Sequence, residues 1–224
     1  MSDPADALAS IRRRIADAAP GRSVTLVAVG KAQPVDAIRA LAAAGQRTFG
    51  ENYVQEALAK RRSLADLPIE WHFIGPLQSN KCREVARHFD WLQSLDREKL
   101  IAPLARHRAP GAPPLDVLVQ VNVDDEASKS GCRPEQVPAL ARAVAAEPRL
   151  RLRGLMSVPA PDPDFERRRA AFRRMRALYD DLAAAHGTVD TLSLGMSDDF
   201  ELALAEGANM VRVGSALFGP RPVK

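Results

Sequence analysis

The sequence is poor in the residues that build cross-links, metal sites and stacking surfaces. Among 224 residues there are 2 cysteines and 4 histidines, and aromatic residues make up 5% of the chain. Cys82 and Cys132 lie far apart and form no Cys-x-x-Cys pair, so we expect two reduced, structural thiols and neither a disulfide framework nor a zinc site. The four histidines are scattered, without the short spacing of metal ligands. The sequence therefore predicts no bound metal.

Long apolar runs are also absent. No uninterrupted apolar stretch reaches the roughly 20 residues that a helix needs to cross a bilayer. The apolar fraction of 46% and the charged fraction of 27% are ordinary for globular proteins. Residues 4–19 mix Leu8 and Ile11 with arginines, which predicts an amphipathic helix without the apolar segment of a signal peptide. We therefore expect a cytoplasmic protein with no membrane partner.

The positive charge is concentrated in one segment. The net charge is +4, and six arginines lie between Glu166 and Arg176, which makes this segment a candidate nucleic-acid surface. Phe172 and Met175 recur at helical spacing in the same segment, so the arginines also fit the solvent face of an amphipathic helix. Because aromatic residues for base stacking are scarce, we favour the second interpretation and expect no nucleic-acid partner.

Short apolar runs alternate with amphipathic stretches along the whole chain. The runs predict eight strands, at residues 24–29, 47–50, 70–74, 91–94, 115–122, 150–156, 188–194 and 210–213. The stretches between them predict helices at residues 34–44, 53–64, 80–89, 97–107, 134–146, 164–186 and 198–205. Such alternation implies parallel strands with right-handed crossovers, and eight units at this length favour a closed barrel over an open sheet. We predict a single α/β domain over residues 1–224, a (β/α)8 TIM barrel with an extra N-terminal helix.

In such a barrel the chemistry lies at the carboxyl ends of the strands. Lys31 stands there, directly after the first predicted strand and Gly30. One interpretation is a lysine whose ammonium group reaches water at the barrel rim. The other is a desolvated amine of the kind that Schiff-base chemistry requires.

The end of the chain favours the second interpretation. Ser197, Gly214 and Ser215 open helical turns after the last two predicted strands. Backbone N–H groups at such positions bind anions, and the loops after strands seven and eight are the usual phosphate site of this barrel. Ser197 also suits a helix cap, and the two roles are compatible. Asp198 and Asp199 would repel a phosphate, so we expect both to face solvent.

Arg212 lies within the apolar run 210–213, where a buried guanidinium needs a partner. That partner is either a structural ion pair or the pyridine nitrogen of pyridoxal 5′-phosphate (PLP). Because arginine remains charged, the second arrangement would leave the ring nitrogen unprotonated. The cofactor would then be a poor electron sink.

Other polar residues have simpler explanations. Glu51, Asp124 and Asp125 lie in turn-like or helix-starting contexts where acidic residues are common, so we assign none of them a catalytic role. His72 stands between two aromatic residues. We expect it to pack in the core with its ring nitrogens satisfied, and not to act in the barrel lumen.

Seven motifs follow one another in order: VAVGKAQP at 27–34, FGENYVQE at 49–56, WHFIGPLQSNK at 71–81, KSGC at 129–132, GLMS at 154–157, GMSDD at 195–199 and VRVGSALFGPR at 211–221. Together they closely resemble the pyridoxal phosphate homeostasis proteins over nearly the whole chain. These proteins are similar to the barrel domain of bacterial alanine racemase without its second domain. Gly30 is a departure, since many relatives have serine there, but it leaves the neighbouring lysine intact.

The resemblance implies a cofactor and the residues that hold it. PLP would be bound covalently, as a Schiff base on Lys31. The further cofactor-binding residues that it implies are Ser197, Gly214 and Ser215 at the phosphate, Arg212 at the pyridine nitrogen, and Asn52 and Met156 beside the ring.

The resemblance also implies a function in intracellular vitamin B6 and amino-acid homeostasis without substantial catalysis. It suggests a monomer that passes PLP to apo PLP-dependent enzymes. Alanine racemase takes a catalytic tyrosine from the second domain of its other subunit, and we expect no such domain here. Racemisation needs proton transfer on two faces, so Lys31 alone would be inefficient. The alternative function is a slow PLP-dependent amino-acid racemase or lyase, which turnover assays would separate.

Overall fold

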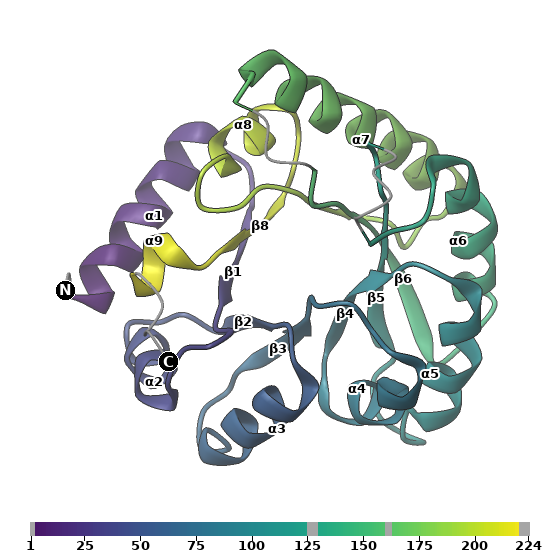
Figure 1. Ribbon diagram of the computed structural model, residues 1–224, viewed down its shortest axis with the longest axis horizontal. Coiled ribbons are helices and arrows are strands. Elements are labelled where there is room, and N and C mark those ends of the chain that lie inside the picture. Colours follow the sequence, from purple (N-terminus) through teal and green to yellow (C-terminus); the bar gives the residue numbers. More distant parts are fainter. Residues whose placement is uncertain (1–2, 125–129, 160–162, 220–224) are drawn as a thin grey trace.

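The computed structural model describes residues 3–124, 130–159 and 163–219. Within them eight parallel strands pair in sequence order and close into a barrel between the first and the last. Figure 1 shows the helices surrounding the strands. The predicted (β/α)8 architecture is therefore confirmed.

All eight predicted strands are present. They are β1 Thr25–Val29, β2 Thr48–Glu51, β3 Glu70–Phe73, β4 Trp91–Leu95, β5 Leu115–Gln120, β6 Leu150–Met156, β7 Thr191–Ser193 and β8 Met210–Val213. The prediction was least accurate for β7, which begins at Thr191 and not at residue 188. A turn precedes the strand there, and in it the Val189 N–H donates a hydrogen bond to the His186 carbonyl.

The predicted helices are also present, with shorter ends. They are α1 Pro4–Ala18, α2 Val35–Ala43, α3 Val54–Ser63, α4 Cys82–His88, α5 Ile101–His107, α6 Val137–Ala145, α7 Phe165–Ala185, α8 Phe200–Ala205 and the single turn α9 Ser215–Phe218. Short 3-10 turns at 79–81, 98–100 and 134–136 precede α4, α5 and α6. No helix among the described residues is long and apolar enough to span a membrane.

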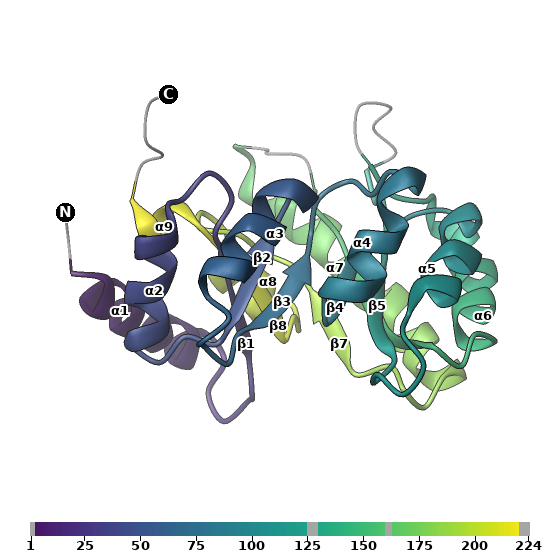
Figure 2. The same cartoon turned by 90° about the horizontal axis from the view of Figure 1, so that it is seen from below.

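The extra helix α1 covers one side of the barrel. Its buried residues Leu8, Ile11 and Ile15 lie on one face at helical spacing, and the Asp3 carboxylate caps the Ala5 N–H. α1 contacts α2, α8 and α9, and Figure 2 shows α1, α2 and α9 side by side at one end of the molecule. The helix therefore braces the seam where β1 meets β8.

The apolar core has two parts. The larger part fills the space between the strands and the surrounding helices, as the apolar runs of parallel strands predict. A smaller cluster inside the barrel contains Val27, Trp91, Leu118, Met156 and Met210. Polar side chains, among them His72, Gln93, Ser193 and Arg212, are also buried inside the barrel and support the candidate site.

Helix α7 carries the cluster of arginines. Phe172 and Met175 on its inner face are fully buried. Arg169 and Arg173 pair with Glu206 on the neighbouring α8 side, at 2.9 and 3.1 Å. Arg174 likewise pairs with Asp124, whereas Asp125 lies outside the described residues. These arginines thus form the solvent face of an amphipathic helix.

Candidate functional site at the barrel mouth

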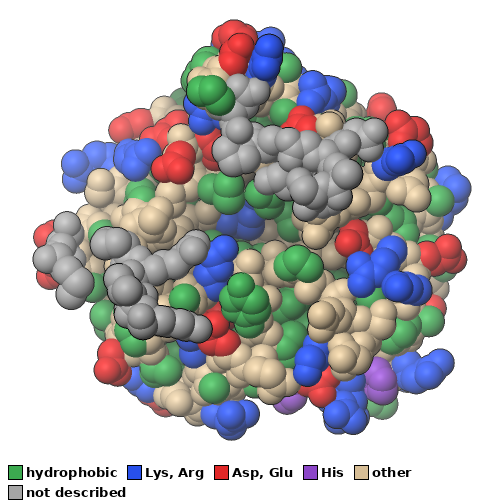
Figure 3. Space-filling model, in the orientation of Figure 1, with side chains coloured by type: hydrophobic (Ala, Val, Ile, Leu, Met, Phe, Trp, Pro, Cys, Tyr) green, Lys and Arg blue, Asp and Glu red, His purple; other side chains and the backbone are tan. Residues whose placement is uncertain are grey.

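A pocket of about 240 Å³ lies at the carboxyl ends of β1, β7 and β8. The described residues that line it are Val29, Lys31, Gln33, Met196, Ser197, Asp198, Arg212, Gly214, Ser215 and Gly219. Five of the seven predicted site residues therefore meet there. Figure 3 shows basic side chains in the hollow near the centre of this face, bordered by hydrophobic ones. Parallel pairing of β1 with β8 brings Lys31, which follows the first strand, close to Gly214 and Ser215, which follow the last.

Ser197 lies among hydrogen-bond donors. Its Oγ accepts hydrogen bonds from the backbone N–H groups of Gly214, at 3.3 Å, and Ala216, at 3.5 Å. α9 is one turn long, so these donors and not a helix dipole define the local electrostatics. Both bonds are long, and a phosphate oxygen is a stronger acceptor than a hydroxyl. The cluster is therefore suited to an anionic oxygen.

Arg212 reaches the pocket from β8 and is 4% exposed. Its Nη1 donates to the Ser193 carbonyl at 2.9 Å and to Ser193 Oγ at 2.6 Å, and its Nη2 donates to the Ser157 carbonyl at 2.8 Å. A guanidinium has five N–H groups, so two remain without a partner among the described residues. Burial lowers the pKa of Arg212 to about 10, which leaves the group charged at neutral pH.

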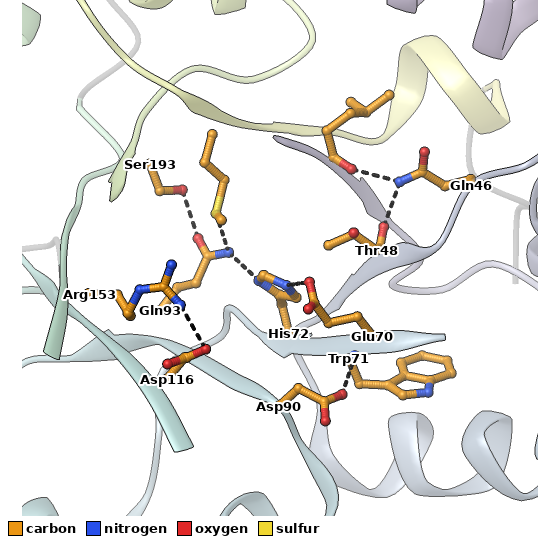
Figure 4. Close-up of polar contacts among 12 residues, drawn as sticks. Gln46, Thr48, Glu70, Trp71, His72, Asp90, Gln93, Asp116, Arg153 and Ser193 are labelled. Carbon is orange, nitrogen blue, oxygen red and sulfur yellow. Dashed lines mark hydrogen bonds and ion pairs between the residues drawn. The ribbon is translucent and has the colours of Figure 1, made fainter. Parts of the chain in front are cut away.

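A chain of hydrogen bonds continues from Arg212 through the barrel interior, and Figure 4 shows its part from Ser193 to Glu70. Ser193 Oγ donates to Gln93 Oε1 at 2.8 Å, and Gln93 Nε2 donates to His72 Nδ1 at 2.8 Å. His72 Nε2 then donates to Glu70 Oε1 at 2.9 Å. Every donor points away from Arg212, so the bonds polarise one another from a guanidinium at the mouth to a carboxylate at the opposite end. The hydrogen bond from His72 lowers the pKa of Glu70.

The prediction for His72 holds in part: the ring is packed with both nitrogens satisfied, but it faces the barrel interior. Its side chain is fully buried, both ring nitrogens have partners, and the ring stacks on Trp91 with centroids 5.1 Å apart. The assignment of the proton to Nε2 follows from these partners, because Gln93 presents a donor to Nδ1. No pattern in the sequence indicates that this packed histidine belongs to the support of Arg212.

The prediction that both aspartates face solvent holds for only one of them. Asp198 is exposed at the rim of the pocket. Asp199 is half-buried, and its Oδ1 accepts a hydrogen bond from the Met196 N–H at 2.7 Å. Burial raises the pKa of the Asp199 carboxyl. The prediction for Asp199 was wrong because the turn before α8 leaves an amide that needs an acceptor.

Asn52 and Met156 are not among the residues that line the pocket. Met156 is fully buried in the lumen cluster with Val27 and Trp91. Asn52 follows β2, and its Oδ1 is buried without a hydrogen-bond partner among the described residues. Its backbone packs tightly on Gly75, where an added Cβ would lie 2.2 Å from the Asn52 carbonyl oxygen. Their contact with a cofactor remains a prediction.

Sequence analysis missed an ionic network behind Lys31. Lys60, on α3, donates to the Gly30 carbonyl at 2.6 Å, to Glu51 Oε1 at 2.8 Å and to Glu56 Oε1 at 2.6 Å. Burial raises the pKa of Glu51 to about 7. A signal was present, because Val54, Ala57 and Lys60 recur at a spacing of three and form the buried face of α3.

Comparison with known proteins places this barrel in a family. A model of the alanine racemase N-terminal domain matches residues 5–222. The pyridoxal phosphate homeostasis protein of Pseudomonas aeruginosa is 54% identical over 226 residues, which cover 99% of this chain and 97% of that relative. The chain belongs to the pyridoxal phosphate homeostasis protein family. Another member, from Escherichia coli, is 50% identical over 229 residues, with coverage of 99% of this chain and 98% of the relative.

Solved structures agree with membership of the pyridoxal phosphate homeostasis protein family. PipY of Synechococcus elongatus is 38% identical, and its structure without PLP matches with a TM-score of 0.85 over 96% of this chain and 99% of PipY. Its structure with PLP bound matches with a TM-score of 0.83 over 96% of this chain and 100% of PipY. Alanine racemase from Corynebacterium glutamicum is 24% identical with a TM-score of 0.70 and shares the fold.

Proposed function

We propose that this protein binds PLP in the pocket at Lys31 and acts in intracellular vitamin B6 and amino-acid homeostasis without substantial catalysis. The observation that carries the proposal is the meeting of Lys31, the donors around Ser197 and the Arg212 guanidinium in one pocket. The PLP-bound structure of PipY, a relative over the whole barrel, supports it.

The residues of the pocket fit three parts of the cofactor. Ser197, Ser215 and the Gly214 N–H are suited to the phosphate, because each offers a hydrogen bond to an anionic oxygen. The amine of Lys31 is suited to the aldehyde, with which it forms a Schiff base by releasing one water molecule. The two N–H groups of Arg212 without a described partner are suited to the pyridine nitrogen, which has a lone pair.

The same residues argue against efficient turnover. When bound, PLP supplies an aldehyde and an electron-accepting ring. Arg212 only donates hydrogen bonds, and its pKa of about 10 keeps it charged, so it leaves the ring nitrogen unprotonated. The described pocket lining contains no histidine, tyrosine or cysteine to act as a second acid or base, and its carboxylate, Asp198, is exposed at the rim.

The proposal also covers the domain organisation, location and oligomeric state of the protein. We propose that the protein is a single cofactor-binding domain over residues 1–224, present in the cytoplasm as a monomer. PLP is its small-molecule partner, and apo PLP-dependent enzymes receive the cofactor. Nucleic acids, metals and membranes are not among its proposed partners.

The absorption spectrum of the purified protein loaded with PLP tests the proposal. We expect a visible imine band that borohydride removes, leaving a reduced adduct on the peptide that contains Lys31. Lys31→Ala should abolish both signals with the fold intact, because the residue lies at the mouth and outside the packed core. Lys99→Ala, at an exposed position, is the matched control and should keep both. An adduct that persists in Lys31→Ala would assign the Schiff base to another lysine.

Amino-acid turnover provides the second arm. We expect added amino acids to alter the spectrum with negligible racemisation or transamination. Sustained wild-type turnover of any amino acid near the rate of ~10 per second that is typical of enzymes would contradict the non-catalytic function.

A further inference from the structure

Both peptide groups that flank Lys31 are bound by side chains of α3. The Gly30 carbonyl, on one side, accepts a hydrogen bond from Lys60 Nζ at 2.6 Å. The Ala32 N–H, on the other side, donates to Glu56 Oε1 at 2.7 Å. Lys60 and Glu56 are themselves joined at 2.6 Å, one helical turn apart. A single ion pair thus clamps the backbone before and after Lys31.

The clamped turn has a conformation that needs support. Ala32 has a φ of +59°, the only positive value of a non-glycine residue in the described chain. Residues with a Cβ adopt this left-handed region at an energetic cost, and they persist there when surrounding contacts hold them. The bond from the Ala32 N–H to Glu56 is such a contact. It fixes the turn from which Lys31 enters the pocket.

The lysine of the ion pair is buried, and all its donors are engaged. The side chain of Lys60 is 6% exposed, and each of its three N–H groups has an acceptor, in Gly30, Glu51 and Glu56. Burying a lysine is unfavourable unless its charge and all its donors are satisfied. An apolar residue at position 60 would fill the space but would remove the cation beside the fully buried Glu51 carboxylate and one of the two donors to the Gly30 carbonyl. The arrangement therefore favours a role in geometry over one in packing.

We propose that Lys60 and Glu56 are positioning residues for Lys31, which hold its turn so that its amine meets the carbonyl group of the cofactor. The inference rests on the proposed function, because it assigns the Schiff base to Lys31. Lys60 is not itself the amine that reacts, since its donors are all engaged away from the pocket lining.

A double-mutant cycle on PLP binding tests the proposal. Glu56→Ala is made in the wild-type protein and in Lys31→Ala, and the dissociation constant of PLP is measured in all four proteins, with the rise of the imine band in those that keep Lys31. We expect Glu56→Ala to weaken binding and slow the rise of the band about tenfold, within the range of couplings inside one network. In the Lys31→Ala background it should change the dissociation constant less than about twofold. Glu56→Gln keeps an acceptor for the Ala32 N–H and should restore most of the loss.

Amide hydrogen exchange gives a readout that needs no cofactor. In the apo protein the Ala32 amide should be protected in the wild type and in Glu56→Gln, and should exchange about tenfold faster or more in Glu56→Ala. Glu98→Ala, at an exposed glutamate, is the control and should change neither exchange nor binding. Both glutamate variants leave Lys60 in place, so the test does not depend on a lysine variant that fails to fold.

The outcomes separate this inference from the proposed function. Equal loss of PLP affinity in both backgrounds would show a general structural role and overturn the inference, as would an unprotected Ala32 amide in the wild type. A wild-type protein without the borohydride adduct would overturn the proposed function itself. A wild-type adduct together with an additive cycle would overturn the inference alone.

Discussion

Two polar networks support the pocket from the sides of β1 and β8, and they are built differently. Behind Lys31 the network consists of charged groups, in which Lys60 bridges two glutamates. Behind Arg212 it consists of hydrogen-bonded polar groups, with Ser193, Gln93 and His72 in line. The network behind Lys31 is a salt-bridge cluster around a buried lysine. The network behind Arg212 is a line of hydrogen bonds that ends at the carboxylate of Glu70.

The difference determines which wall responds to pH. Burial raises the pKa of Glu51 to about 7, and its Oε2 has no partner among the described residues, so the charge of the first network changes near neutrality. Arg212 has a pKa of about 10, far from that range. The wall at Lys31 therefore has a titratable charge at physiological pH, whereas the wall at Arg212 keeps a fixed one.

Removing the bridging lysine should have the largest effect. Lys60→Met leaves Glu51 as a buried carboxylate without its cation, which costs about 3–5 kcal/mol of unfolding free energy. Urea unfolding at pH 8 measures the loss. At pH 5.5 the loss should be smaller, because Glu51 is then protonated. Arg62→Met, at an exposed position of the same helix, is the control and should change stability little. An equal loss of unfolding free energy at both pH values would contradict the titration of Glu51 near neutrality.

The pH dependence of the wild type sharpens the same point. The pKa of Glu51 is raised in the folded state, from 4.5 to about 7, so the folded protein binds its proton more tightly than the unfolded chain does. The stability that this supplies is fully present below pH 4.5 and is lost as the pH rises through 7. Its size is on the order of 3 kcal/mol. Glu51→Gln should flatten the profile of unfolding free energy between pH 5 and 8, and Glu98→Gln should leave it unchanged.

The hydroxyl groups on the Arg212 side should affect retention of PLP without affecting its attachment. Ser197→Ala and Ser215→Ala each remove a hydrogen bond to a charged group, worth about 1.5–3 kcal/mol of binding free energy. Equilibrium dialysis measures the weaker binding, and the imine band should survive in both. Unchanged affinity in both variants would place the phosphate elsewhere.

Breaking the hydrogen-bond chain of Ser193, Gln93 and His72 should have the smallest effect on stability. Ser193→Ala removes one acceptor of Arg212 and the donor to Gln93, at a cost of about 1–2 kcal/mol of unfolding free energy. The cost should stay below that of Lys60→Met, because Ser193→Ala leaves no buried carboxylate without its cation. Ser63→Ala, at an exposed serine, is the control. A cost as large as that of Lys60→Met would erase the contrast between the two networks.

The barrel and most of its pocket were predictable because both follow from local patterns. Alternating apolar runs predict the strands, and the rule that chemistry lies at their carboxyl ends brings Lys31, Ser197 and Arg212 together. The networks behind them were not predictable, because they depend on which side chains face one another across the packed structure. Lys60 shares the spacing of a buried helix face, but only the packing of α3 against β2 adds Glu51 and the Gly30 carbonyl to the acceptor on its own helix. Asp199 turns inward for a local amide that the pattern of charges does not reveal.

The pairing of β1 with β8 also has a consequence for biosynthesis. Val27 lies opposite Arg212 in that pairing, so the two walls of the pocket come from the first and the last strands of the barrel. A chain emerging from the ribosome presents Lys31 long before Arg212 exists, and contacts so distant in sequence form late because closing the intervening loop costs entropy. A nascent chain therefore carries the lysine without the pocket around it. Under the proposed function, a truncated product that lacks β8 would therefore lack the Arg212 side of the PLP site.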